Sequence, residues 1–200
     1  MADYSDSVFI NCPFDDDYRG LFRAIVFTIY VCGFFPRCAM EEDDALDNRI
    51  NKILKIIDEC KFGIHDISRT EPNPEGYPRF NMPFELGVFF GCKHYGVNKN
   101  KVGLVFERTK YSYQQTLSDL NGIDTKAHNN NYENVITQIV NWLKTSSKRT
   151  NIPGYQSVIA SFDKFEEDLP NILADTGLTI EKMTFNDLAY IIEQWISVKS

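Results

Sequence analysis

The chain has 200 residues, of which 43% are hydrophobic and 24% charged, and its 21 basic and 28 acidic side chains give a formal net charge of −7. These globular proportions exclude a disordered, collagen-like or coiled-coil protein. The acidic balance without a basic stripe argues against nucleic-acid binding. An acidic amino terminus and the lack of a long apolar run argue against a signal peptide and a membrane span. We therefore expect a cytoplasmic globular protein that binds neither nucleic acid nor membrane.

The cysteines and histidines predict no metal centre. Five cysteines are odd in number, form no CxxC pair and lie in apolar segments, as reduced buried thiols do. The three histidines, His65, His94 and His128, are far apart in the sequence. A structural zinc site needs close ligand pairs, which this chain lacks. We expect neither a metal nor a resident cofactor.

The first 145 residues alternate between strand-like and helix-like patterns. We expect strands over 7–11, 34–39, 62–67 and 102–106 and an edge strand over 123–128. Between them we expect helices over 15–32 and 46–60, a helix from Pro83 to about Tyr95, a short helix over 113–120 and, at the end, a helix over 133–143. A long polar loop over 68–81 follows the third strand. Such alternation with short connections forms right-handed βαβ units. The fold class is thus α/β: a flavodoxin-like, mostly parallel sheet with helices on both faces.

The carboxyl-terminal quarter differs in composition. A polar stretch over 145–150, followed by Pro153-Gly154, is typical of a linker. Beyond it, two helices are expected over 157–169 and 184–198, the second starting with a capping box of Thr184 and Asp187. Two helices cannot enclose a core, so we divide the chain into an α/β domain over 1–147 and a helical extension over 148–200, packed on that domain or on a partner subunit.

Polar residues follow three of the predicted strands, at the edge where doubly wound folds bind ligands. Convergence of such groups from separate segments is what a small-molecule site requires. The candidate substrate-binding residues are Asn11, Cys12, Pro13, Phe14, Tyr18, Arg37, Ser68, Arg69, Arg79 and Asn81. Asp66 ends a strand and is a candidate catalytic group or a structural one. His65, in the same strand, is a core histidine or a catalytic base.

Glu85 is the most informative residue. It lies in the first turn of an otherwise apolar predicted helix, where the helix dipole favours an ionised carboxylate. One interpretation is a simple dipole partner; the other is a nucleophile or an ion-pair stabiliser, since a general acid needs a raised pKa. Gly87 and Gly91, four residues apart, predict a smooth helix side packed closely on the sheet.

Three segments carry a family resemblance. Phe80-Asn-Met-Pro-Phe-Glu-Leu-Gly-Val-Phe-Phe-Gly91, Val8-Phe-Ile-Asn-Cys-Pro-Phe-Asp15 and His65-Asp-Ile-Ser68 resemble the TIR-like and nucleoside 2-deoxyribosyltransferase-like superfamily, in element order over about residues 7–145. The resemblance implies a TIR-like fold and cleavage of an N-glycosidic bond, with Glu85 acting at the anomeric carbon. NAD or a nucleoside would then be the substrate.

The resemblance also assigns roles to the candidate residues. It implies that Asn11 and Asp66 position the ribose and that Phe14 or Tyr18 stacks on the base. Arginines at three positions would meet phosphates: Arg37, Arg69 and Arg79. It further implies a bacterial, anti-phage defence protein that works as a homo-oligomer.

Two other functions stay open beside the enzyme. The same crevice could recognise a nucleotide without breaking it, as a sensor does, or the TIR-like fold could serve only as a protein-interaction domain. An enzyme needs Glu85, a sensor needs ligand binding but not Glu85, and an interaction domain needs neither Glu85 nor a ligand.

Overall fold

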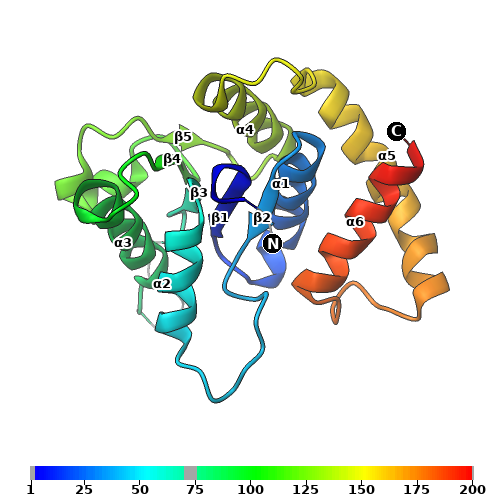
Figure 1. Cartoon of the computed structure of the whole chain (residues 1–200), viewed down its shortest axis with the longest axis horizontal. Helices are drawn as coiled ribbons and strands as arrows, with labels where there is room; N and C mark the ends of the chain where they lie inside the picture. Colours follow the sequence, from blue (N-terminus) through cyan, green and yellow to red (C-terminus); the bar gives the residue numbers. More distant parts are fainter. Residues whose placement is uncertain (1–2, 70–75, 200) are drawn as a thin grey trace.

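The computed structural model describes residues 3–69 and 76–199. Within these residues, five parallel strands form one sheet in the order β2–β1–β3–β4–β5 (Figure 1). The strands are β1 (Ser7–Asn11), β2 (Phe35–Arg37), β3 (Phe62–Asp66), β4 (Val102–Glu107) and β5 (Lys126–Ala127). This parallel order confirms the flavodoxin-like fold class, and the last strand lies at the sheet edge as expected.

Helices cover both faces of the sheet. They are α1 (Arg19–Val31), α2 (Arg49–Glu59), α3 (Asn81–Tyr95), α4 (Tyr132–Ser147), α5 (Tyr155–Thr176) and α6 (Phe185–Lys199). Successive side chains of a strand point to opposite faces. Accordingly Val8 and Ile10 of β1 join the core beneath α1 and α4, whereas Phe9 joins the core beneath α2 and α3.

Two expected helices are shorter or broken. The helix predicted from Asp15 begins with a 3₁₀ turn, η2 (Asp16–Tyr18), and becomes α-helical only at Arg19. The helix predicted over 113–120 consists of two 3₁₀ turns, η3 (Ser112–Gln115) and η4 (Ser118–Leu120). In both places a buried tyrosine fixes the backbone: Tyr18 bonds to β3, and Tyr113 lies in a small core with Ile67.

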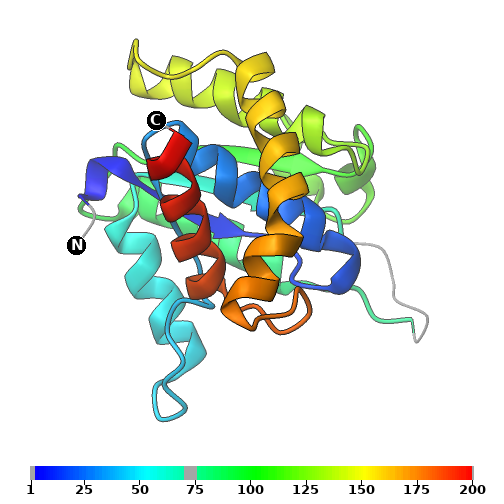
Figure 2. The ribbon, with the colours of Figure 1, turned by 90° about the vertical axis from the view of Figure 1, so that its right-hand side faces the viewer.

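Helices α5 and α6 form an outer layer on α1 and α4 (Figure 2). Phe27 of α1 contacts the rings of Phe162, Phe165 and Trp195 at centroid distances of 5.4, 5.2 and 5.7 Å. Helix α5 continues through Pro170, beyond its expected end, and stops where Gly177 adopts a φ of +70°. One apolar core therefore includes both carboxyl-terminal helices.

The start of α6 has the predicted capping box. The Thr184 hydroxyl accepts from the Asp187 backbone N–H, and the Asp187 carboxylate accepts from the Thr184 backbone N–H.

None of the helices in the described ranges is both long and apolar enough to cross a membrane.

Candidate functional site

A buried polar cluster lies where β3 ends. The Asp66 carboxylate accepts hydrogen bonds from the Tyr18 hydroxyl at 2.5 Å and from the Ser68 backbone N–H at 2.8 Å. His128 Nε2 lies 3.1 Å from the same carboxylate, although its N–H is not aimed along a hydrogen bond. Asp66, His128 and Tyr18 are all buried. The cluster therefore connects β3, the start of α1 and the segment after β5, and it turns neither Asp66 nor Tyr18 toward solvent.

Asn11, at the end of β1, holds the first turn of α3. Its side-chain amide donates to the Met82 carbonyl at 2.8 Å and lies 3.2 Å from Nδ1 of His65. Burial lowers the pKa of His65 to about 3, so the ring is neutral at physiological pH. It packs edge-on against Phe89 at 4.7 Å. The geometry is that of a core histidine, and Asn11 positions the helix that carries Glu85.

Glu85 differs from its polar neighbours because it is mostly buried and has no partner among the residues that the structure describes. The side chain is 7% exposed and has no hydrogen bond or ion pair within residues 3–69 and 76–199. Helix α3 begins at Asn81, so Glu85 lies in the second turn and not in the first. Burial raises its pKa to about 7, and the charge of Arg49 opposes this rise. The expectation that the dipole keeps it fully ionised is therefore wrong, since burial outweighs the dipole.

The glycines of α3 are not packed as predicted. A Cβ atom built on Gly87 or Gly91 would meet nothing within 4 Å. Both therefore lie on the side of α3 that faces away from the sheet, which Leu86 and Phe89 contact instead. The structure gives no packing reason for glycine at these positions.

A cavity of about 510 Å³ opens beside this edge of the sheet. Its walls come from parts of three segments: 13–23 after β1, 39–49 after β2, and 180–188 at the start of α6. This volume lies within the range of small-molecule sites. Arg49 lines the cavity and also acts electrostatically on Glu85, although Glu85 itself does not line the cavity.

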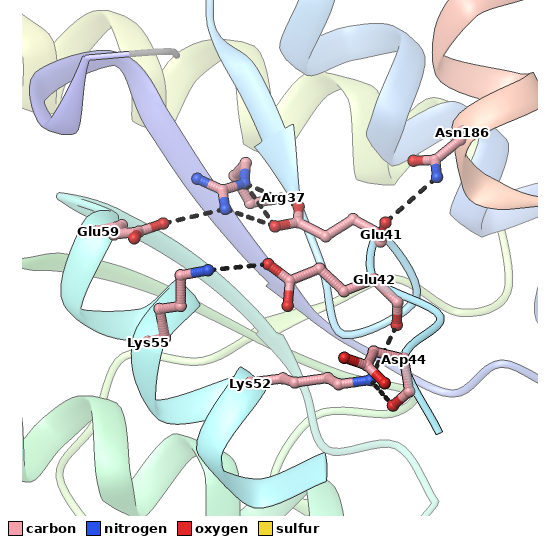
Figure 3. A network of polar contacts seen from close by, with 8 residues as sticks. All are labelled: Arg37, Glu41, Glu42, Asp44, Lys52, Lys55, Glu59 and Asn186. Atoms are coloured by element: carbon pink, nitrogen blue, oxygen red, sulfur yellow. Dashed lines mark hydrogen bonds and ion pairs between the residues drawn. The ribbon is translucent and has the colours of Figure 1, made fainter. Parts of the chain in front are cut away.

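Polar contacts hold the acidic segment between β2 and α2 (Figure 3). Arg37 donates to Glu41 at 2.7 and 2.9 Å and to Glu59 at 3.1 Å. Lys52 Nζ donates to the Asp44 carbonyl at 2.6 Å. Because Arg37 is occupied in this way and does not line the cavity, it is not placed to bind a phosphate there.

Further contacts in Figure 3 tie the same segment to its neighbours. Lys55 pairs with Glu42 at 3.0 Å, and the Asn186 side chain of α6 donates to the Glu41 carbonyl at 3.2 Å. The second of these bonds joins the β2–α2 segment to the carboxyl-terminal helices. Two walls of the cavity are thereby connected.

The remaining candidate residues fall into three groups. Pro13 and Phe14 line the cavity. Arg69 and Arg79 are bound to Asp15, at 2.9 and 3.1 Å, and do not line it. Cys12 and Ser68 are buried, whereas Asn81 is exposed at the start of α3.

The Cys12 thiol is held neutral beside these carboxylates. Burial raises its pKa well above the usual value, and the charges of Asp66 and Glu85 add to the rise.

Among the described residues, no group of three or more His, Cys, Asp or Glu side chains could hold a metal ion.

Several cavity residues escaped the sequence analysis. Arg49 and Asp43 follow the short second strand, and the rule that ligands bind after strand ends could have found them. Met183 and Phe185 belong to the extension, about 150 residues after β2. Nothing local in the sequence indicates that they reach the sheet edge, because only packing on α1 brings them there.

Comparisons with known proteins give no family for this chain. Neither the protein-family models nor the curated proteins contain a match to it.

Proposed function

We propose that the protein cleaves the N-glycosidic bond of a nucleotide or nucleoside, with the Glu85 carboxylate facing the anomeric carbon. One observation carries the proposal: Glu85 is a 7% exposed acidic side chain that has no partner in the described part of the chain, and Arg49 of the cavity lining acts on it electrostatically. Burying an unpaired carboxylate opposes folding. Strongly perturbed groups of this kind concentrate at functional sites.

The chemistry matches the residue. Cleavage breaks the bond between the anomeric carbon and the base nitrogen, and the electron pair leaves with the base. The sugar then carries positive charge, which a nearby ionised carboxylate stabilises or attacks, as in glycosidases. Water completes the reaction by giving its hydroxyl group to the carbon. Its remaining proton goes to the departing base of a nucleoside or, for NAD, whose nicotinamide leaves neutral, to solvent. The similarity of the segment around Glu85 to TIR-like and deoxyribosyltransferase-like proteins supports NAD or a nucleoside as the substrate.

The test is base release by the purified protein, with NAD and with nucleosides as separate substrates. Glu85→Gln keeps the side-chain size and removes the charge, so we expect at least a hundredfold loss of turnover. The matched control is Glu167→Gln, which removes an exposed carboxylate of α5. Activity that survives in Glu85→Gln would contradict the proposal.

The pH profile sharpens the same test. Because the pKa of Glu85 is raised to about 7 and the ionised form is the reactive one, kcat/KM should rise as the pH increases through about 7. A profile that falls across this range would identify Glu85 as a general acid.

A second candidate is nucleotide binding without cleavage. It is favoured by the observation that Glu85 does not line the cavity. In that case a nucleotide should raise the Tm of the wild type and of Glu85→Gln equally, and neither protein should release a base.

A further inference from the structure

The carboxyl-terminal extension completes the cavity with an aromatic wall. The Phe14 ring contacts Phe22 at a centroid distance of 5.4 Å, and Phe22 lies 6.2 Å from Phe185, the first residue of α6. All three rings line the cavity, but Phe22 and Phe185 are 8% and 6% exposed, so the 39% exposed Phe14 is the ring that a ligand can reach. Such a wall can stack against a planar ring, and base–aromatic stacking tolerates any base.

Most charges around the cavity are already paired. Asp15 binds Arg69, Arg19 binds Asp16, and Arg23 binds Glu166 through two hydrogen bonds. By contrast, Arg49 and Asp43 have no hydrogen bond or ion pair to any other residue that the structure describes. A free guanidinium is suited to a phosphate, and a free carboxylate accepts hydrogen bonds from sugar hydroxyls.

The number of unpaired arginines in the lining limits the ligand. Of its three arginines, Arg19 pairs with Asp16 and Arg23 with Glu166, which leaves Arg49. A single phosphate therefore has one arginine to meet, whereas a chain of phosphates would meet no second unpaired arginine in the described lining.

We propose that this cavity binds a nucleoside monophosphate, with its base on Phe14, which Phe22 and Phe185 support from behind, and its phosphate on Arg49. The choice of a nucleotide rests on the proposed function, and the extension is then a specificity element of the site. The bond from Asn186 to the Glu41 carbonyl holds two walls in place before binding (Figure 3). Preorganisation of this kind favours affinity.

The test is calorimetric titration of the full chain with nucleoside monophosphates, the matching nucleosides and the triphosphates. We expect the monophosphates to bind more tightly than either of the other two groups. Phe14→Leu should weaken binding of nucleotide and nucleoside alike, about tenfold. The control is Phe35→Leu, which removes a ring of similar exposure, 40%, outside the cavity.

Arg49 has a different expected signature. Arg49→Gln should weaken monophosphate binding about tenfold and leave nucleoside binding unchanged. Lys182→Gln removes a positive charge from the same region without touching the cavity, and it should change neither affinity. An unchanged Tm for each variant shows that the fold is intact.

The outcomes separate this inference from the proposed function. Binding that depends on Phe14 and Arg49, without base release by the wild type, supports the cavity site and refutes cleavage. Base release that needs Glu85 but is indifferent to Phe14 and Arg49 refutes the cavity site and keeps the enzyme. Absence of binding at millimolar concentrations of every monophosphate overturns the inference.

Discussion

The polar groups around Asp66 and those around Glu85 lie at the same edge of the sheet, yet they are partnered in opposite ways. Asp66 is fully buried and accepts hydrogen bonds from Tyr18 and Ser68, with His128 close by. Glu85 is nearly as buried but has no hydrogen bond or ion pair to any residue that the structure describes, and Arg49 acts on it only electrostatically. A satisfied buried carboxylate stabilises the loops that it joins, whereas an unsatisfied one costs stability and stays free for a ligand.

The largest effect should come from the satisfied group. Asp66→Asn places an amide NH₂ against either the Ser68 N–H or the Nε2–H of His128, so two donors face each other in a buried site. We expect a loss of about 3–5 kcal/mol in the free energy of unfolding, measured by urea denaturation. Asp119→Asn, on exposed η4, should change it by less than about 0.5 kcal/mol. If both variants lost the same free energy of unfolding, the proposed structural role of Asp66 would be contradicted.

Glu85→Gln should raise the free energy of unfolding, whereas Asp66→Asn lowers it. The raised pKa means that folding favours the protonated form, so wild-type stability falls as the pH rises from about 4.5 to about 7. The variant lacks this penalty, and at pH 8 it should be more stable than wild type by on the order of 2–3 kcal/mol. The gain should vanish near pH 4. Denaturation curves at the two pH values measure it, and a gain that is the same at both would contradict an ionising Glu85.

Asn11→Ala tests the link between the two regions. It removes the buried bond to the Met82 carbonyl in the first turn of α3 and leaves Nδ1 of His65 without the amide that lies 3.2 Å from it. We expect a loss of about 1–3 kcal/mol in stability. If Asn11 acts by positioning α3, the variant should also lower kcat more than it raises KM, and the pH profile should shift with it. A stability loss with unchanged kinetics would make Asn11 structural only.

The smallest effect concerns the cavity walls. Asn186→Ala removes an exposed hydrogen bond to the Glu41 carbonyl, so the free energy of unfolding should fall by only about 0.5 kcal/mol. Ligand affinity should fall by more than this stability change implies, because the walls are no longer fixed before binding. Thermal unfolding and calorimetric titration of the same protein make the comparison. Unchanged affinity would show that the bond does not organise the cavity.

Glu85 and its surroundings show which features of the site can be predicted from the sequence and which cannot. The alternation of strands and helices predicted the parallel α/β fold, and the position of Glu85 after the third strand predicted that it lies toward the carboxyl ends of the strands. Its pKa was misjudged, because sequence position indicates the helix dipole but not the depth of burial. Phe14 or Tyr18 was expected to stack on a base, and only the fold shows that the Tyr18 hydroxyl is bound to Asp66.

By itself, the sequence determined the fold class and the capping of α6, since both depend on local periodicity and on residues three positions apart. The tertiary structure alone decided which polar groups are satisfied and which stay free. Arg37 is occupied by Glu59 and Asp66 by Tyr18, while Phe185 reaches the cavity from the far end of the chain. These pairings depend on side chains that meet only after the sheet and its helical layers have packed, so no local sequence pattern predicts them.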